Sequence, residues 1–189
     1  MNIGLLREGK NPPDRRVAFS PDQCAYIMQS YPELSLYAQP SQSRCFLDLE
    51  YEKNGVIITE DLSNCDVIMG IKEVPIDMLI NNKIFFFFSH TIKKQPYNKL
   101  LLQAILEKNI QLVDYETLRG EDTKRIIGFG RYAGIVGCYN SFLAYGKKST
   151  NYNLKAPQLL MDIKELYKEL QKVSLPKDFK IVLTGNGRV

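Results

Sequence analysis

Residues 84–88 read Ile-Phe-Phe-Phe-Phe, and this run constrains the fold more than any other part of the chain. A strand with one face in water alternates apolar and polar residues, and this run does not alternate. Protein therefore has to cover it on both faces, as it covers a strand inside an α/β sheet. The alternative is an aggregation-prone edge strand, and we expect the inner position.

Strand-like and helix-like segments alternate along the rest of the chain. Short apolar or β-branched runs predict further strands at residues 3–6, 34–38, 56–59, 66–71, 111–113, 125–130 and 180–183. Apolar residues spaced three and four apart predict helices at 21–31, 46–55, 96–109, 132–146 and 157–173. We read 132–146 as a buried helix. The alternation predicts a three-layer α/β fold, with a mostly parallel, Rossmann-like (flavodoxin-like) sheet and helices on both faces.

Composition excludes several classes of protein. Of the 189 residues, 44% are hydrophobic and 24% are charged, which is typical of a folded globular chain. The net charge of +4 is spread along the sequence, whereas nucleic-acid binders concentrate their basic residues. No apolar stretch approaches the roughly 20 residues of a membrane span, and charges near the N-terminus argue against a signal peptide.

The cysteines give a further indication of compartment and chemistry. They stand far apart and form no Cys-x-x-Cys pair: Cys24, Cys45, Cys65 and Cys138. Reduced, buried thiols are typical of a cytoplasmic protein. The single histidine and these scattered cysteines do not make a ligand cluster, so we expect no metal site.

Ionisable residues follow several of the predicted strands. His90, the only histidine in the sequence, comes directly after the aromatic strand. Lys72 and Glu73 follow the preceding strand, and Glu116 follows the next one. Because the carboxyl ends of parallel strands meet at one edge of a sheet, where open α/β folds bind ligands, we expect these side chains to share a cleft.

The residue types at this edge suit acid–base chemistry on an anionic substrate. Arg15 and Arg16, in the loop after the first strand, each offer a planar fork for a carboxylate. His90 exchanges a proton near neutral pH, and a lysine such as Lys72 can hold or move a second one. Each residue taken alone is more often structural than functional, and the shared edge puts the functional interpretation of the group level with the structural one.

Blocks of sequence resemble one enzyme family. They are DRRVAFSP, GIKEVP, FFSHTIKKQPYNKLLL, LVDYETL and RIIGFGRYAGIVG. The blocks resemble the N-terminal region shared by alanine dehydrogenase, the nicotinamide nucleotide transhydrogenase and the lysine-forming saccharopine dehydrogenases. The run His-Thr-Ile-Lys is similar to the saccharopine-type members, and the lysine–2-oxoglutarate reductase half of bifunctional lysine-degrading enzymes has the same blocks. The resemblance covers most of the chain and is weak at residues 147–177.

The resemblance implies a role for each matching residue. Arg16 matches an arginine that holds a substrate carboxylate, and Arg15 is the alternative match. Lys72 and His90 match the acid–base residues of the family. Glu73 and Glu116 match acidic residues that tune these two cations and help to bind substrate.

The last ten residues, KIVLTGNGRV, resemble the start of a dinucleotide-binding fingerprint. An apolar strand leads into a Gly-x-Gly turn, in which Gly185 and Gly187 match the first two cofactor-binding glycines. We therefore expect residues 1–177 to form a substrate domain and residues 178–189 to begin a domain for NAD or NADP. On this reading the chain is an N-terminal piece of a longer enzyme, is inactive alone, and binds NAD(P)H weakly or not at all.

The resemblance implies an NAD(P)-dependent oxidoreductase acting on CH–NH groups, with an amino acid and a 2-oxo acid as small-molecule partners. The saccharopine-type blocks favour the reductive condensation of lysine with 2-oxoglutarate and its reverse. Alanine dehydrogenase chemistry, with ammonia and pyruvate, is the alternative within the family. A non-catalytic binding or assembly domain is the alternative outside it, and the sequence leaves homo-oligomer formation open.

Overall fold

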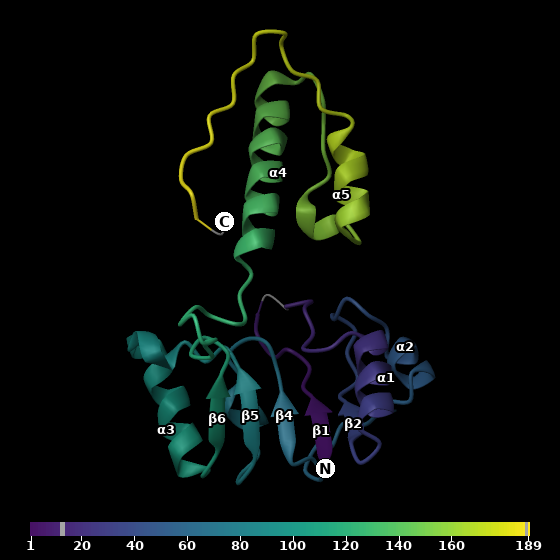
Figure 1. Ribbon diagram of the computed structural model, residues 1–189, viewed down its shortest axis with the longest axis vertical. Coiled ribbons are helices and arrows are strands. Elements are labelled where there is room, and N and C mark those ends of the chain that lie inside the picture. The colour runs from purple at the N-terminus through teal and green to yellow at the C-terminus, as the bar shows by residue number, and fades with distance from the viewer. Residues whose placement is uncertain (12–13, 188) are drawn as a thin grey trace. The chain divides into compact units, whose positions relative to one another are not determined.

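A parallel sheet forms the centre of the N-terminal part of the chain (Figure 1). The computed structural model describes residues 1–11, 14–187 and 189, and in these ranges the sheet has six strands. They are β1 (Asn2–Leu5), β2 (Ser35–Ala38), β3 (Ile57–Ile58), β4 (Val67–Met69), β5 (Ile84–Phe87) and β6 (Gln111–Asp114). Their order, β3-β2-β1-β4-β5-β6, is that of Rossmann domains, so the predicted α/β fold is confirmed.

Strand β5 carries the aromatic run and lies between β4 and β6, as the lack of alternation predicted. Phe86 pairs with Met69 on one side and with Val113 on the other. Phe85 and Phe87 are fully buried in one hydrophobic cluster, while Phe86 packs against a second cluster. The run can be apolar throughout because each face of the sheet has its own core.

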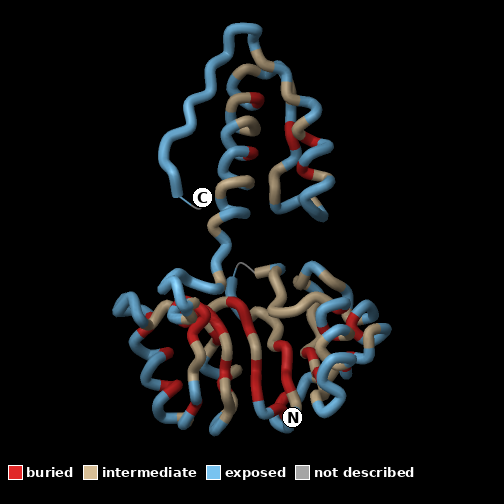
Figure 2. Tube along the Cα trace, viewed as in Figure 1, coloured by how far each residue is buried: buried red, intermediate tan, exposed pale blue. Residues whose placement is uncertain are grey.

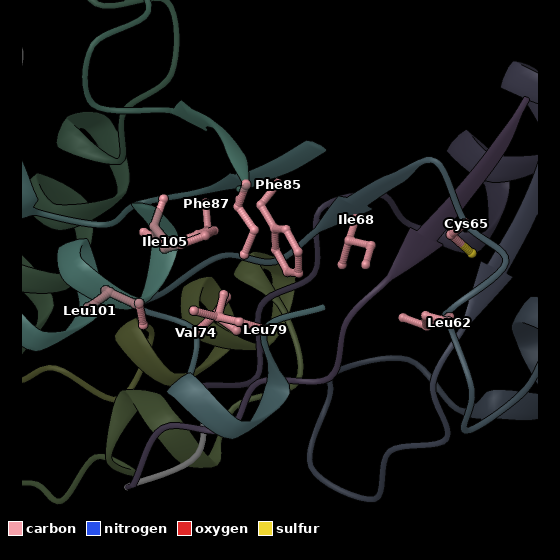
Figure 3. Close-up of a cluster of buried hydrophobic side chains, with 11 residues drawn as sticks. Leu62, Cys65, Ile68, Val74, Leu79, Phe85, Phe87, Leu101 and Ile105 are labelled. Atoms are coloured by element: carbon pink, nitrogen blue, oxygen red, sulfur yellow. The ribbon is translucent and has the colours of Figure 1, made fainter. Parts of the chain in front are cut away.

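Helix α3 (Lys99–Glu107) covers one face of the sheet. It packs through Leu101 and Ile105, which Figure 3 shows close to the phenylalanines of β5. The helix follows a short 3-10 turn, η3 (Pro96–Asn98), because a proline ring fits the first turn of a helical segment. A further 3-10 turn, η1, lies at Ile76–Met78.

Helices α1 (Pro21–Ser30) and α2 (Asp48–Lys53) cover the opposite face. Helix α1 starts where it does because the side chain of Ser20 accepts the Gln23 N–H and the side chain of Gln23 accepts the Ser20 N–H. Its core side contributes Cys24, whose thiol pKa is raised to about 12 by burial. Figure 2 shows the buried residues concentrated along the strands and the helix faces next to them. The prediction of helices on both faces is therefore confirmed.

A second compact unit, Gly128–Val189, contains two α-helices in the part of the chain that the structure describes. Helix α4 spans Gly130–Ser149 and helix α5 spans Ile163–Leu170. A glycine permits close packing here, since a Cβ atom at Gly146 would lie 2.6 Å from the ring of Tyr152. The small core of this unit consists of Tyr139, Leu154 and Leu166.

The segment 132–146 is helical, as predicted, but it is not a buried helix. Tyr139 and Gly146 are the buried residues of α4, and most of its other side chains are exposed or partly exposed. The hydrophobic spacing predicted the helix correctly and overestimated how much of it the described residues cover. No helix in the described ranges is both long enough and apolar enough to cross a bilayer.

The amphipathic helix predicted at residues 157–173 is shorter than expected. Residues Pro157–Leu159 form a separate 3-10 turn, η4, and α5 begins only at Ile163. The start is set by Asp162, whose side chain accepts the Glu165 N–H at 2.8 Å and thereby caps the helix.

The strand predicted at residues 180–183 is not formed. Ile181, Val182 and Leu183 are exposed by 63%, 83% and 92%, and the segment has no ladder partner within the described residues. Because a strand is held by bonds to a neighbour, an apolar run without one stays irregular. Two compact units are distinguished, Met1–Ile127 and Gly128–Val189, and helices α4 and α5 pack together in the second. The substrate domain expected at residues 1–177 and the cofactor domain expected after it stay predictions.

Candidate active site

The carboxyl edge of the sheet gathers the ionisable side chains that the sequence singled out. Glu8 follows β1, Lys72 follows β4, and His90 follows β5. Glu116 follows β6 at the same edge. The chain leaves β1 toward β2 over one face of the sheet and leaves β4 toward β5 over the other, so β1 and β4 form the topological switch point, where doubly wound folds bind ligands.

Glu8 ties the end of β1 to the end of β4. Its Oε1 atom accepts the Ile71 N–H at 2.7 Å, and its Oε2 atom accepts the Lys72 N–H at 2.9 Å. Burial raises the pKa of Glu8, and the two amide bonds oppose this shift without cancelling it. Sequence reading missed Glu8, although it follows its strand in the same way as Lys72 does.

Lys72 is half-buried, and its ammonium group has no hydrogen bond or ion pair with the residues that the structure describes. Its charge acts at longer range on Asp14. Hydrogen bonds from Arg16 lower the pKa of Asp14 most, and the attraction of Lys72 adds to this effect. The backbone of Lys72 is thus fixed while its charged end keeps its capacity to bind.

Arg16 lies at the same edge, where it lines a small cavity with Glu8 and Ile71. Its Nε and Nη2 atoms donate to the two carboxylate oxygens of Asp14, at 2.9 and 2.5 Å. One bidentate edge of the guanidinium therefore holds a protein carboxylate, where the sequence predicted a substrate carboxylate. A substrate can take this edge only by displacing Asp14. Arg15, the alternative register, is exposed.

His90 and Glu73 form a close pair that Lys10 extends. His90 Nδ1 lies 2.5 Å from Glu73 Oε1, and Lys10 Nζ lies 3.2 Å from Glu73 Oε2. Burial alone would raise the pKa of Glu73, but the bonds from His90, the backbone and Lys10 outweigh it and lower the pKa. An ionised carboxylate only accepts, so the ring hydrogen of neutral His90 sits on Nδ1 and leaves Nε2 for a reactant.

The backbone of His90 adopts a conformation that is rare for this residue type. Its φ is 55° and its ψ is 9°, in the left-handed region, which costs a non-glycine residue about 1–2 kcal/mol. The 3-10 turn η2 (Thr91–Lys93) follows directly. The imidazole stacks on Phe88, with ring centroids 6.3 Å apart and planes inclined by 26°. Strained residues of this kind gather at functional sites.

Glu116 is buried, with 7% of its side chain exposed, and it pairs with two cations. Its Oε1 atom lies 3.1 Å from Arg125 Nη2 and 3.3 Å from Lys93 Nζ. Its Oε2 atom has no hydrogen-bond partner among the described residues. A buried carboxylate oxygen with unused acceptor capacity suits an N–H or ammonium group of a ligand.

Ser89, Thr91 and Asp114 form a buried network that sequence reading did not select. Ser89 Oγ lies 2.5 Å from Asp114 Oδ2 and 2.7 Å from Thr91 Oγ1. Asp114 Oδ1 accepts the Glu116 N–H at 2.8 Å. Asp114 is the last residue of β6, and other strands of the sheet also end just before site residues. Its position at the end of a strand was therefore the sequence feature that could have identified it.

The two glycines predicted to bind cofactor lie in the second unit. Gly185 has a φ of +96°, which favours glycine, and a Cβ atom added at Gly185 or Gly187 would meet nothing within 4 Å. Both features fit a turn that lets a phosphate approach the backbone. The helix N-terminus that completes such a site is not among the described residues after Gly185, so no cofactor geometry follows.

A parallel sheet of Rossmann order, with a lysine, a histidine and carboxylates at its carboxyl edge, defines a doubly wound α/β domain, a fold class in which ligands bind at that edge. The described residues contain no group of three or more side chains suited to a metal ion. Residues 4–136 match the model of the family described as alanine dehydrogenase/PNT, N-terminal domain. The chain belongs to this family, which confirms the resemblance that the sequence blocks indicated.

Three known proteins illustrate the relationship. Alpha-aminoadipic semialdehyde synthase of Arabidopsis thaliana is 33% identical over 172 residues, covering 89% of this chain and 16% of that protein. The NAD(+), L-lysine-forming saccharopine dehydrogenase of Candida glabrata is 26% identical over 209 residues, covering 100% of this chain and 55% of that protein. The structure of an L-alanine dehydrogenase has the same fold, with a TM-score of 0.63 and 15% identity, over 80% of this chain and 43% of that chain.

The relatives place the chain in a family of amino-acid dehydrogenases, which are oxidoreductases. The chain spans only 16% of the Arabidopsis protein and 55% of the Candida protein.

Proposed function

We propose that this chain is the substrate-binding part of an NAD(P)-dependent dehydrogenase that condenses lysine with 2-oxoglutarate reductively and runs the reverse reaction. The observation that carries the proposal is the pairing of His90 with Glu73, next to Lys72, at the switch point of the sheet. The relatives named alpha-aminoadipic semialdehyde synthase and lysine-forming saccharopine dehydrogenase support the choice of substrates.

The residues at the edge suit the proton transfers of this reaction. Joining an amine to a ketone and expelling water requires protons to leave nitrogen and reach oxygen. His90 Nε2 takes one of these roles, since Glu73 holds the opposite ring nitrogen. The Lys72 ammonium, held in place through its backbone by Glu8, binds the carbonyl oxygen or carries the second proton. A nicotinamide cofactor, when bound, would supply the hydride for the reduction.

The charges at the edge suit a dicarboxylate and an amine. Arg16 binds one substrate carboxylate after displacing Asp14, since the two carboxylates compete for the same guanidinium edge. The free Oε2 atom of Glu116 accepts the ammonium group of the amino-acid substrate. These assignments give Arg16 and Glu116 binding roles and leave the chemistry to Lys72 and His90.

We further propose that residues 178–189 begin a dinucleotide-binding domain, in which Gly185 and Gly187 form the phosphate turn for NAD or NADP. The exposed apolar side chains of Val182 and Leu183 support this proposal, because a strand inside such a domain would bury them. The free thiols of the cysteines suit the cytoplasm.

Alanine dehydrogenase chemistry is the second candidate, and the description of the matching family favours it. The same residues would then act on ammonia and pyruvate. A non-catalytic binding or assembly domain is the third reading, in which Lys72 and His90 have no chemical role.

The test is steady-state turnover by the enzyme in which this chain precedes a complete dinucleotide-binding domain. Oxidation of NAD(P)H is followed with lysine plus 2-oxoglutarate, and separately with ammonia plus pyruvate. Lys72→Met is expected to lower kcat by about 10²–10⁴-fold, while Lys53→Met, on the exposed side of α2, leaves it unchanged. Arg16→Lys loses the fork and is expected chiefly to raise KM for the oxo acid.

Each outcome separates the candidates. Turnover with neither substrate pair contradicts both dehydrogenase readings and favours the binding domain. Turnover with ammonia and pyruvate alone favours the second candidate. An active enzyme whose Lys72→Met variant keeps the full rate contradicts the role given to Lys72.

A further inference from the structure

We propose that Ser89, Thr91 and Asp114 act as a clamp that positions His90 for proton transfer. These three residues touch no reactant in this proposal and act through the imidazole, so they are positioning residues. The chemical role of His90 rests on the proposed function, whereas the clamp itself can be tested without turnover.

The clamp joins the two residues that flank His90 in the sequence, Ser89 and Thr91. Thr91 donates its backbone N–H to Ser89 Oγ at 3.1 Å, and the two hydroxyl oxygens lie 2.7 Å apart. These bonds close a tight turn across a single residue, and His90, at the centre of that turn, has a φ of 55°. A non-glycine residue keeps such a conformation only where its surroundings over-determine it. The bonds between Ser89 and Thr91 are contacts of this kind.

The direction of each hydrogen bond follows from Asp114. Its Oδ2 atom accepts the Ser89 hydroxyl hydrogen at 2.5 Å. Since the single hydrogen of Ser89 is used in this bond, the Thr91 hydroxyl donates to Ser89 Oγ. The clamp is therefore a directed chain, from Thr91 through Ser89 to Asp114, and removing the Thr91 hydroxyl takes away its first member.

Asp114 anchors the clamp to the sheet. It is buried at the end of β6, in register with Phe87 at the end of β5. Its second oxygen accepts the Glu116 N–H at 2.8 Å. One buried carboxylate thus sets the turn that presents His90 and the backbone that presents Glu116, which couples two predicted site residues on neighbouring strands.

Holding the backbone of His90 also holds its ring. The imidazole has contacts on two sides, with Nδ1 at 2.5 Å from Glu73 and one face on Phe88. Both contacts require the Cα–Cβ bond of His90 to point as the left-handed backbone directs it. A displacement of about 1 Å at a reacting group can lower a rate about 100-fold. A network serving stability alone would leave the ring signals unchanged when it is weakened.

The single histidine makes the ring observable without ambiguity in the 189-residue chain. Nuclear magnetic resonance of the imidazole is expected to show a resolved Nδ1–H proton and ¹⁵N shifts of one tautomer when the ring is neutral. Thr91→Val keeps the shape of the side chain and removes the hydroxyl, and it is expected to lose the Nδ1–H signal and average the ¹⁵N shifts. Thr91→Ser keeps the hydroxyl and is expected to preserve both signals.

A matched control lies close by. Thr117 donates its hydroxyl to the backbone oxygen of Asp114 at 2.9 Å and takes no part in the clamp. Thr117→Val is therefore expected to leave the ring signals as they are in the wild type. Ser89→Ala tests the second member and is expected to act like Thr91→Val. If this buried substitution prevents folding, the comparison at the half-buried Thr91 decides.

Wild-type ring signals in Thr91→Val overturn the clamp, and so does a wild-type chain without a resolved Nδ1–H proton. In the intact enzyme, Thr91→Val is expected to lower kcat up to about 100-fold with little change in KM for the oxo acid. A Thr91→Val variant that loses the ring signals and keeps full turnover supports the clamp and contradicts the proposed catalytic role of His90. The two proposals therefore fail in different ways.

Discussion

The two units of the chain bury their apolar side chains to different extents. In Met1–Ile127 both faces of the sheet are covered, and Phe87 is fully buried. In Gly128–Val189 the buried core is small, and Val182 and Leu183 are exposed by 83% and 92%. Since burial contributes about 25 cal/mol for each Å² of apolar surface, the stability of the chain resides mainly in its first unit.

The difference shows that an apolar pattern specifies an element without ensuring that the element is covered. Helix α4 and the segment 180–183 have the residues of buried elements, and the described residues cover them only in part. In the first unit, by contrast, the helices that cover the sheet belong to the same unit as the strands. Matched substitutions in the two units should therefore differ in their effect on the free energy of unfolding.

The largest effect is expected at the centre of the first unit. Phe87→Ala removes a fully buried ring from the core between β5 and α3, and such truncations cost about 3–5 kcal/mol. Urea unfolding followed by circular dichroism measures the loss. Leu106→Ala, at a side chain of α3 that is 72% exposed, is the control and is expected to change stability by less than about 0.5 kcal/mol. A loss below about 1 kcal/mol for Phe87→Ala would contradict the two-core description.

A smaller and local effect is expected in the second unit. Leu166→Ala opens a small core next to solvent, where neighbours can relax, so the loss is expected near the lower end of the usual range, about 2 kcal/mol. Hydrogen exchange should show faster exchange in α4 and α5 and unchanged exchange in β4 and β5. Equal acceleration in the sheet would mean that the two units unfold as one.

Two carboxyl groups of the first unit, Glu73 and Glu8, are expected to change the free energy of unfolding with pH in opposite directions. The pKa of Glu73 is lowered from its ordinary value of 4.5, so its stabilising contribution is present above pH 4.5 and is lost as the pH falls through the folded-state value. Glu73→Gln should flatten the acid side of the stability curve. Removing a hydrogen bond to a charged group costs about 1.5–3 kcal/mol when the partner stays buried, and we expect about 1 kcal/mol at this partly exposed pair.

Glu8 is the contrasting case, because burial raises its pKa above 4.5. Its contribution is therefore greatest below pH 4.5 and declines as the pH rises through the folded-state value. Glu8→Gln should steepen the rise of stability with pH where Glu73→Gln flattens it. Unfolding free energies measured between pH 3 and pH 7 would reveal the two signs, and slopes that change in the same direction would contradict this assignment.

The smallest effect is expected at the C-terminal segment. Leu183→Ser replaces a side chain that is 92% exposed and is expected to change the free energy of unfolding by less than about 0.5 kcal/mol. Thermal unfolding measured by calorimetry is sensitive enough for this comparison. A loss above about 1 kcal/mol would show that the segment is packed in solution, contrary to its exposure here.

The sequence predicted the sheet better than it predicted the site. The aromatic run and the strand–helix alternation were sufficient because burial on two faces leaves a strong pattern. The end-of-strand rule placed Lys72, His90 and Glu116 at one edge, because parallel strands share a direction. The end-of-strand rule could not predict that the carboxylate of Asp14 would accept hydrogen bonds from the guanidinium of Arg16, since that pair depends on how an irregular loop folds back on itself.

Other parts of the site left only a weak trace in the sequence. In the proposed clamp the left-handed conformation of His90 is held by bonds among Ser89, Thr91 and Asp114, residues whose types are common in loops and strand ends. The packing partner of the helix at 132–146 could not be predicted either, because its hydrophobic pattern is the same whether the helix packs on the sheet or on α5.

The carboxylate of Glu8 has a consequence for the order of folding. It binds the amide of Lys72, a residue 64 positions further along the chain. A contact across so long a loop carries a large closure entropy, so it forms after the local helices and depends on β1 and β4 already lying side by side. The residues proposed for acid–base chemistry are therefore expected to come together late in folding, so that a partly folded or nicked chain would have helices but no assembled site.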